Sequence, residues 1–517
     1  MYRRLSAKTL NRLVLLAPAA VVVYLYLNLF TFFGTPFLLN GDQVYFWMYG
    51  QRMLHGERAY VDFFQFLPPG IDIVFFAAFK ALGPRVWVTN MVVLALGAVL
   101  SLLCFRLASH VMDRSSALLA TALFVSLVYG RPLNATHHWF AVMLILSAAA
   151  AVIGRRSLVR IGFAGALLGL ASFFTQTHGV AAAGALGLFL AWEGLTGRAS
   201  WRGLLSKEAA LAVGFCAALS AAWAPYVATV GLRELWDLQF TYVRKFGLQA
   251  IGTPWLGLPE APTWHRLPAV APYFFVYGVL AFTYPAVFMA CWRDRRRGTA
   301  SGEGNNVVLL GLVGLFLFVE VLFSPNWLRL YTISMPAIIL FVWRLARTRT
   351  ASRVLGLLWI VAVAFAVGQT WSRQLQNSAL GDFRGGRVAI PERAYAKLRW
   401  VSDHTARNDL FFQAPWPGMY IPLDLRNPAY LDAISTVQAI RPDDLARTIR
   451  ELDAKQVRYV LWSPALDQSD PRNWGSHQLS PIRQYLHTRY ERVHTFPDLD
   501  EIWERKQDSG ASPQGRP

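Results

Sequence analysis

Long apolar runs separated by short polar turns fill the chain from residue 13 to residue 371. A helix needs ~20 apolar residues to cross a bilayer perpendicularly, and real spans vary around this length. The pattern predicts an α-helical polytopic membrane protein with about eleven transmembrane helices. They are expected at residues 13–33, 86–108, 115–130, 137–153, 158–175, 178–195, 208–230, 268–291, 306–324, 327–343 and 354–371.

The pattern changes after residue 371. The segments "NDLFF", "VRYVLW" and "DEIWER" are typical of short strands, and "RPDDLARTIRELDA" predicts a helix with Pro442 in its first turn. We therefore expect a transmembrane region at 1–371, a small α/β domain at 372–506 and a disordered tail at 507–517. The α/β domain shows no glycine-rich phosphate loop, zinc-ligand spacing or nucleophile elbow, so we expect it to recognise an acceptor or to cover a cavity.

The segment 34–85 is the most informative loop of the predicted transmembrane region. Its first part, "DQVYFWMYGQRML", concentrates aromatic residues and predicts a helix at the level of the lipid headgroups. Its second part, "PPGIDIVFFAAFKALG", begins with Pro68 and Pro69, which suit a helix start, and is too short to span. Asp72 falls in the first turn of that helix, where a carboxylate favours the positive end of the helix dipole.

Composition supports a membrane protein, because 55% of the 517 residues are hydrophobic and 14% are aromatic. The formal net charge of +19 resembles that of a nucleic-acid-binding protein. However, residues 372–517 contain 20 Lys and Arg against 18 Asp and Glu, so the excess lies in the apolar region. Nucleic acid is therefore not an expected partner. The three cysteines lie in or beside apolar runs and define no disulfide framework.

The distribution of basic residues predicts the orientation in the membrane. Cytoplasmic loops retain Lys and Arg, and the basic segments at 3–12, 293–298 and 344–353 all follow the alternation that places the N-terminus inside. An odd number of crossings then places the loop 34–85 and the α/β domain outside the cytoplasm. No small-residue cleavage site follows the first span, which is therefore expected to remain as an anchor.

Asp42 is the first candidate for chemistry, because it lies where the chain leaves the membrane after the first span. It is interpreted either as a solvated charge, as an N-cap of the following helix, or as a catalytic group. Glu320 is a second candidate, because a carboxylate inside an apolar run is costly in lipid and is expected to face the bundle interior. His137 and His138 point about 100° apart on a helix, so they favour a polar contact at the membrane surface over a metal site.

Several motifs in order resemble the GT-C superfamily of integral membrane glycosyltransferases, and in particular its family 39 branch, which includes protein mannosyltransferases and bacterial aminoarabinose transferases. The motifs are Asp42 with Gln43, "MLHGERAYVDFF", "QFLPPG", "GRPLNATHHWF", "LWDLQFTYVRKF", "SPNWLRLYTISMP" and "ERVHTFPDLDEIWER". The chain departs from the family at Gln43, Gln65, Leu67 and His137, where relatives carry acids or, in place of Leu67, often a lysine.

The resemblance implies a membrane transferase that moves a sugar from a polyprenyl-phosphate donor to a glycan, lipid or protein acceptor on the outer face. Asp42 would then activate the acceptor hydroxyl as a base. The donor- or acceptor-binding candidates are Asp62, Gln65, Arg131, His137, Arg244, Lys245, Glu320 and Arg329. Arg52 and Arg58 are further external cations, and each cation could instead orient the protein at the membrane interface. No cofactor is certain, and a divalent metal is left open.

Two other classes of protein fit parts of the pattern. A polytopic lipid or glycan transporter or flippase would also place charges within a bundle, but the internal repeats and matching broken helices typical of transporters are not found. A non-catalytic assembly or sensor protein would explain the external domain but not the aromatic helix that follows Asp42.

Overall fold

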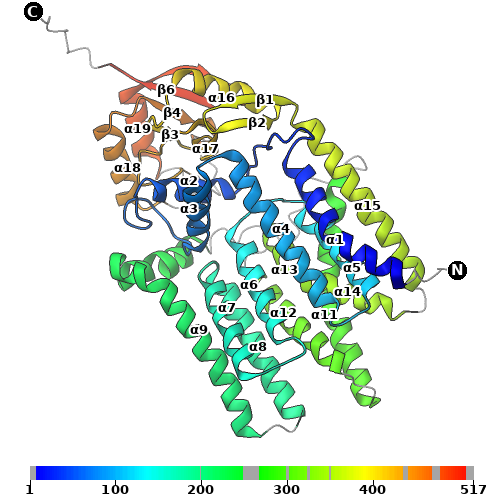
Figure 1. Cartoon of the computed structure of the whole chain (residues 1–517). Helices are drawn as coiled ribbons and strands as arrows, with labels where there is room; N and C mark the ends of the chain where they lie inside the picture. Colours follow the sequence, from blue (N-terminus) through cyan, green and yellow to red (C-terminus); the bar gives the residue numbers. More distant parts are fainter. Residues whose placement is uncertain are drawn as a thin grey trace, which may run out of the picture.

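A bundle of long helices with a small α/β domain at one end makes up the described part of the chain (Figure 1). The computed structural model describes residues 7–197, 200–247, 267–298, 302–322, 327–348, 351–434, 440–467 and 478–507. Almost all of the predicted disordered tail, most of the segment between 231 and 267, and part of "SPNWLRLYTISMP" lie outside these residues.

Each of the eleven predicted spans coincides with helical structure in the bundle. The helices are α1 (Ala7–Leu29), α4 (Val86–Ala108), α5 (Arg114–Leu123) continued by the π-helix η1 (Phe124–Tyr129), α6 (His137–Val152), α7 (Leu158–Ser172), α8 (Gln176–Thr196), α9 (Trp201–Val230), α11 (Leu267–Arg296), α12 (Gly302–Val321), α13 (Trp327–Ile333), α14 (Met335–Ala346) and α15 (Ala351–Gln376). The predicted span 327–343 contains both α13 and α14.

Six of these helices are long and apolar enough to cross a membrane: α4, α8, α9, α11, α12 and α15. Shorter apolar helices lie at Val14–Leu29, Arg114–Tyr129, His137–Val152, Leu158–Ser172 and Met335–Ala346. The chain is thus mostly helical, with several apolar helices of a multi-pass membrane protein, and the total of eleven crossings stays a prediction.

Close helix packing inside the bundle depends on small residues. A side chain at Gly165 of α7 would place its Cβ 2.2 Å from the main-chain oxygen of Leu211 in α9. Without water to drive association, membrane helices gain stability from such close backbone contact. The glycines of α7 and α9 therefore fix two helices of the bundle against each other.

The segment 34–85 forms two helices that lie between the bundle and the α/β domain (Figure 1). These are α2 (Gln43–Leu54) and α3 (Gly70–Leu82), and Pro69 occupies the N-cap position of α3 as its sequence predicts. A Cβ at Gly50 of α2 would lie 2.8 Å from the Cβ of Phe75 in α3. The absence of a side chain at Gly50 thus allows the two helices to pack closely. A further external segment, α10 (Leu232–Trp236) and the π-helix η2 (Asp237–Gly247), follows α9.

The α/β domain contains two sheets. The hairpin of β1 (Ala379–Phe383) and β2 (Gly386–Ile390) is antiparallel. The four-stranded sheet has the order β3 (Phe411–Gln413), β4 (Tyr459–Trp462), β6 (Glu501–Arg505) and β5 (Tyr490–Thr495), with only β3 and β4 parallel. Its helical elements are α16 (Glu392–His404), α17 (Tyr420–Leu423), α18 (Pro442–Ala454), the 3₁₀ turn Pro464–Leu466 and α19 (Ser480–Arg489).

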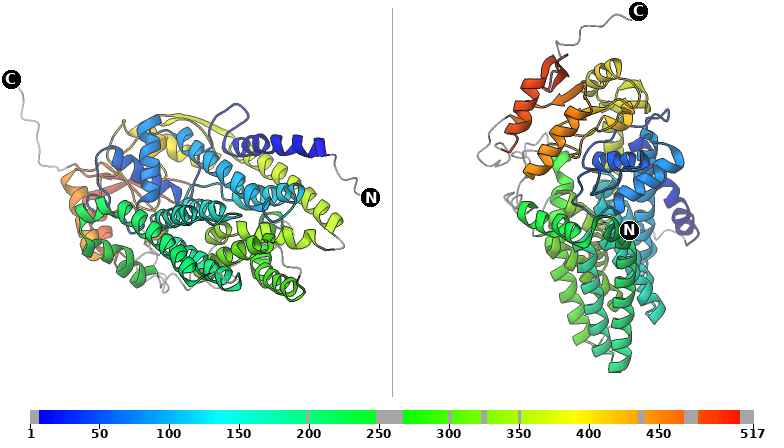
Figure 2. Two further views of the ribbon diagram at one scale, coloured as in Figure 1. Left: turned by 60° about the horizontal axis from the view of Figure 1, so that its bottom comes forward. Right: turned by 90° about the vertical axis from the view of Figure 1, so that its left-hand side faces the viewer.

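Backbone hydrogen bonds join the α/β domain to the first external segment. The amide of Leu38 donates to the oxygen of Ala389 in β2 at 3.1 Å, and the amide of Ala389 donates to the oxygen of Pro36 at 2.9 Å. The amide of Phe64 donates to the oxygen of Tyr430 at 2.9 Å. Two further views show the domain at one end, while the long helices extend away from it (Figure 2). The α/β domain therefore binds the segment between α1 and α4 at two places, residues 36–38 and residue 64.

Candidate active site

Asp42 lies at the start of α2 with a helical backbone conformation (φ −52°, ψ −22°). Asp42 occupies the N-cap position of α2, as one interpretation of the sequence predicts, but its side chain makes no capping hydrogen bond. The side chain keeps contact with solvent. Nevertheless, desolvation by the surrounding protein raises the pKa of Asp42, and the nearby Arg329 guanidinium opposes this rise. A carboxylate with increased proton affinity is suited to accept a proton.

Gln43 fixes the first turn of α2 beside Asp42. It is fully buried, and its Nε2 donates to the main-chain oxygen of Asn40 at 2.9 Å. Its Oε1 accepts from the amide of Ala135 at 3.2 Å, which ties α2 to the turn before α6. The amide of Gln43 therefore uses both its donor and acceptor atoms in positioning Asp42, a role that an acid could not fill in the same way.

A group of polar side chains from α6, α8 and α12 lies next to the start of α2, and its members are buried or half-buried. His137 and His138 begin α6, with ring centroids 4.0 Å apart, and His138 stacks on His178 of α8 at 5.1 Å. The Nδ1 atom of His178 lies 2.7 Å from Oε2 of Glu320 in α12. Glu320 therefore faces the bundle interior, as its position in an apolar run predicts.

Arg329 of α13 connects this group to Asp42. Its guanidinium interacts electrostatically with the carboxylates of both Glu320 and Asp42. His137 also contacts α2 directly, because its ring lies 5.5 Å from that of Phe46 in an edge-on arrangement. The structure thus brings together four of the predicted site residues, Asp42, His137, Glu320 and Arg329, from positions almost 290 residues apart in the sequence.

Asp62 lies in the same loop but is engaged by a neighbour. Its Oδ2 accepts hydrogen bonds from the main-chain nitrogen of Arg58 at 2.8 Å and from Nε of Arg58 at 3.1 Å. Partial burial opposes ionisation, but these hydrogen bonds hold the pKa of Asp62 below its usual value. Asp62 is therefore a stable carboxylate and a poor base, and its predicted binding role stays a prediction.

Gln65 and Asp72 form a buried pair at the start of α3. Nε2 of Gln65 donates to Oδ2 of Asp72 at 2.8 Å, and Oε1 of Gln65 accepts from the amides of Phe66 and Leu67, both at 3.0 Å. Burial raises the pKa of Asp72 well above its usual value, which favours the neutral acid. A neutral carboxyl gains little from the helix dipole, so the predicted charge–dipole contact does not explain Asp72. Gln65 shapes the turn before α3.

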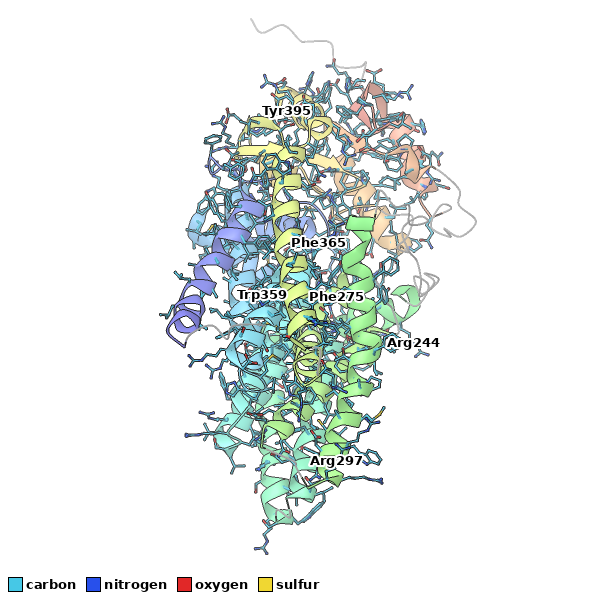
Figure 3. The ribbon with its side chains drawn as sticks, turned by 90° about the vertical axis from the view of Figure 1, so that its right-hand side faces the viewer. Arg244, Phe275, Arg297, Trp359, Phe365 and Tyr395 are labelled. Carbon is cyan, nitrogen blue, oxygen red and sulfur yellow. The ribbon has the colours of Figure 1, made fainter. Side chains whose placement is uncertain are left out.

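The other predicted cations occupy different surroundings. Arg131 is half-buried in the turn after η1, where its main-chain oxygen accepts from Nη2 of Arg373 at 2.9 Å. Arg244 is exposed on η2 and points outward from the bundle (Figure 3). The side chain of Lys245 lies outside the described residues. Their predicted contacts with a donor phosphate stay predictions.

Arg52 has a structural role that its sequence position did not reveal. It is buried and pairs with Oε2 of Glu57 at 2.7 Å, while its Nη1 donates to the oxygen of Ala429 at 2.8 Å and its Nη2 to the oxygen of Asp62 at 3.2 Å. Its guanidinium also lies over the ring of Phe63. Arg52 therefore joins α2 to the α/β domain.

The α/β domain contributes two further contacts to α2. The hydroxyl of Tyr49 donates to Oδ2 of Asp432, and the indole Nε1 of Trp416 donates to Oδ1 of Asn40 at 2.6 Å. Burial raises the pKa of Asp432 to about 6, although the hydrogen bond from Tyr49 opposes this rise. The domain thus holds α2 at its N-terminal end, its middle and its C-terminal end.

The described residues contain no group of three or more His, Cys, Asp or Glu side chains that could hold a metal ion. The rings of His138 and His178 stack, whereas those of His137 and His138 are tilted by 39°. The divalent metal that the sequence left open stays a prediction.

Sequence reasoning missed two features of this site. From the sequence, His138 is expected to make a polar contact at the membrane surface, and His178 either to contact the donor or to cap a helix. The structure instead places both between His137 and Glu320. The residues of the α/β domain at the site, Trp416 and Asp432, gave no local signal, because their partners lie 376 and 383 residues away. An aromatic residue between two prolines in "APWPG" was the available hint, since it predicts a rigid and partly exposed ring.

Comparison with known proteins identifies the fold. No protein-family model and no curated protein sequence matches the chain. The solved structure of ArnT from Cupriavidus metallidurans bound to undecaprenyl phosphate is similar, with a TM-score of 0.59 and 13% identity over 97% of this chain and 99% of that chain. The archaeal oligosaccharyltransferase AglB from Archaeoglobus fulgidus, in complex with an inhibitory peptide and a dolichol-phosphate, has a TM-score of 0.53 and 12% identity over 96% of this chain and 74% of that chain.

These solved structures share the GT-C fold, which is the fold of a class of integral membrane glycosyltransferases. The chain therefore has the GT-C fold, as its ordered motifs predicted. The similarity to ArnT extends over almost the whole length of both chains and so includes the α/β domain as well as the bundle.

Proposed function

We propose that the protein is a glycosyltransferase that moves a sugar from a polyprenyl-phosphate donor to an acceptor hydroxyl outside the cytoplasm. The observation that carries the proposal is the position of Asp42 beside Arg329, at the end of the bundle that carries the α/β domain, in a chain with the GT-C fold. A base and a cation are the two groups that this transfer needs. The similar ArnT and AglB structures were solved with undecaprenyl phosphate and dolichol-phosphate, which supports a lipid-phosphate donor.

Each proposed residue has one role in the reaction. The acceptor oxygen forms a bond to the anomeric carbon of the donor, and the bond from that carbon to the phosphate oxygen breaks. Asp42 takes the proton of the acceptor hydroxyl, and the polyprenyl phosphate leaves with its negative charge facing Arg329. Glu320, which lies 2.7 Å from His178, attracts the Arg329 guanidinium and would help to orient it toward the site. The sugar and the acceptor, whether glycan, lipid or protein, are left open in this proposal.

The function is tested by deleting the gene and analysing lipids and surface glycans by mass spectrometry. A transferase predicts accumulation of a polyprenyl-phosphate sugar together with loss of that sugar from an acceptor. The accumulated lipid is then supplied to the purified protein. Transfer to the unmodified acceptor supports the proposal, whereas movement of the lipid between leaflets with no transfer would identify a flippase instead.

Replacing Arg329 with Gln in this purified assay is expected to weaken use of the donor by ~10- to 100-fold, because a hydrogen bond to a charged group contributes ~1.5–3 kcal/mol. Arg58→Gln is the matched control, since Arg58 is an exposed external arginine whose described partner is Asp62. The apparent donor affinity and the melting temperature are measured for both variants. An unchanged donor affinity in Arg329→Gln would remove the phosphate role.

We also propose that the α/β domain lies outside the cytoplasm of a bacterial inner membrane. Arg297, in the most basic loop, lies at the opposite end of the molecule from Tyr395 of the α/β domain (Figure 3). Basic loops favour the cytoplasmic side. A reporter that is active only outside the cytoplasm should therefore give a signal when fused after residue 380 and none when fused after Arg297. The reverse pattern would place the site on the wrong side of the membrane for the proposed donor.

A further inference from the structure

An aromatic residue of the α/β domain lies directly above the start of α2. Trp416 is in the loop between β3 and α17, and its Nε1 atom donates to Oδ1 of Asn40 at 2.6 Å. Asn40 precedes Asp42 by two residues, so the indole is fixed next to the proposed base. The indole keeps part of its surface open to solvent.

A second aromatic ring completes the arrangement. Tyr45 lies in the first turn of α2, with its ring centroid 5.1 Å from that of Trp416 and an angle of 81° between the planes. The carboxylates of Asp42 and Asp432 both act on the Tyr45 hydroxyl electrostatically, and burial together with these charges raises the pKa of Tyr45, so that its hydroxyl stays protonated. Tyr45 is half-buried, while Asn40 and Asp42 are exposed. The partly exposed rings of Trp416 and Tyr45 therefore lie next to the polar side chains that precede α2.

The loop that carries Trp416 is rigid. Pro415 and Pro417 flank the tryptophan, and each fixes its own backbone φ angle. The amide of Gly418 donates to the main-chain oxygen of Trp416 at 2.8 Å, which closes a tight turn. A rigid ring loses little conformational freedom when a ligand binds, and this is how binding sites gain affinity from preorganisation.

The α/β domain does not need the partly exposed Trp416 for its attachment to the loop 34–85. Arg52, Tyr49 and the amide of Phe64 already join the loop 34–85 to the domain through hydrogen bonds to Ala429, Asp432 and Tyr430. An aromatic side chain with one apolar face and a polar handle is typical of ligand sites, in which a few polar groups fix the orientation of the ligand.

We propose that Trp416 and Tyr45 bind a sugar ring beside Asp42, so that the α/β domain supplies part of the sugar-binding site. The C–H groups of the sugar pack on the aromatic faces, and its hydroxyls reach Asn40 and Asp42. This inference rests on the proposed function for its role in catalysis, and the binding itself is measured without turnover. The ring belongs either to the donor or to the acceptor.

The binding test uses saturation-transfer difference NMR on the full-length protein, in a detergent without a sugar headgroup. The probes are methyl α-mannopyranoside, methyl β-glucopyranoside and methyl α-arabinofuranoside. The wild type is expected to transfer saturation to at least one probe. Trp416→Leu should weaken that binding by ~2- to 10-fold, the range for loss of an aromatic contact. Trp416→Phe keeps a ring and should retain most of the binding.

Trp400→Leu is the matched control, because Trp400 is a partly exposed tryptophan of the same domain that packs on His404 and His494 and is not part of the proposed site. It should bind the probe as the wild type does. Equal binding by the wild type and Trp416→Leu, or no saturation of any probe by the wild type, would overturn the inference.

Kinetics with the isolated donor and acceptor identify the source of the ring. A raised KM for the acceptor alone in Trp416→Leu assigns the site to the acceptor sugar, and a raised KM for the donor alone assigns it to the donor sugar. If the purified protein transfers no sugar but binds the probes through Trp416, the proposed function fails and the sugar site stands. If transfer proceeds with both KM values unchanged in Trp416→Leu, the sugar site fails and the function stands.

Discussion

Replacing Asp42 with Asn is expected to lower turnover by ~100-fold or more, because an amide cannot accept the proton of the acceptor hydroxyl and general-base assistance contributes ~10²- to 10⁴-fold. Asn has nearly the volume of Asp, and the Asp42 side chain makes no capping hydrogen bond that would be lost. The melting temperature should therefore change little. The measurement is kcat in the purified assay with the donor that accumulates in the deletion strain.

Asp62→Asn is the internal comparison for this prediction. Asp62 lies in the same loop, but Arg58 holds its pKa low and occupies its oxygens, so a smaller loss of activity is expected. The pH profile gives a second readout. Because desolvation raises the pKa of Asp42, kcat of the wild type should increase with pH through a midpoint above the usual aspartate value of 3.8. Full activity of Asp42→Asn would remove the catalytic assignment.

The hydrophobic pattern predicted the bundle well, because a helix in lipid must satisfy its own backbone and cover it with apolar side chains over a fixed length. The predicted span 86–108 has the same bounds as α4, and helix α6 ends within one residue of its prediction. The division of 327–343 at Ser334 was missed, although Thr332, Ser334 and Pro336 interrupt the apolar residues there. There the hydroxyl of Ser334 donates to the oxygen of Tyr331 at 2.8 Å.

The α/β domain shows where local patterns become insufficient. The strands β3, β4 and β6 and the helix α18 were predicted from apolar runs and from the acids after Pro442. The hairpin of β1 and β2 was not predicted, because three glycines between residues 379 and 390 interrupt its apolar residues. Its stability depends on main-chain bonds from β2 to residues 36–38, more than 340 positions earlier. Pairing at such separation leaves no local periodicity.

The site was predicted only in part, again because its contacts join residues that are far apart in the sequence. Sequence proximity grouped Asp42 with Asp62 and Gln65, but the structure pairs Asp62 with Arg58 and Gln65 with Asp72. Asp42 instead faces Arg329, a residue almost 290 positions later in the sequence. The group around Asp42 and Arg329 forms where the ends of α2, α6, α8, α12 and α13 pack together. A hydropathy pattern predicts helices but not which helices pack against each other.

Arg52 is expected to show the largest effect on stability of any residue in the external loop. Arg52→Ala removes the partner of Glu57 and the donors to the oxygens of Ala429 and Asp62 in one step. Loss of one member of a buried ion pair costs ~3–5 kcal/mol. Glu57 is half-buried and would keep only its longer contact with Arg426 at 3.8 Å, so a cost toward the lower end of this range is expected. The apparent melting temperature should fall clearly, and hydrogen exchange should increase along α2 at residues 43–54.

A matched variant separates this structural role from a role in binding phosphate. Arg58→Ala also removes a loop arginine, but Arg58 is exposed and its ion pair with Asp62 is solvated, so melting temperature and exchange should stay close to those of the wild type. Since Arg52 joins α2 to the α/β domain, Arg52→Ala should also lower kcat by displacing Asp42, and a double variant with Asp42→Asn should lose little further activity. Normal melting and exchange in Arg52→Ala, combined with a raised KM for the donor alone, would show that Arg52 binds the lipid phosphate and that other contacts hold α2 on the domain.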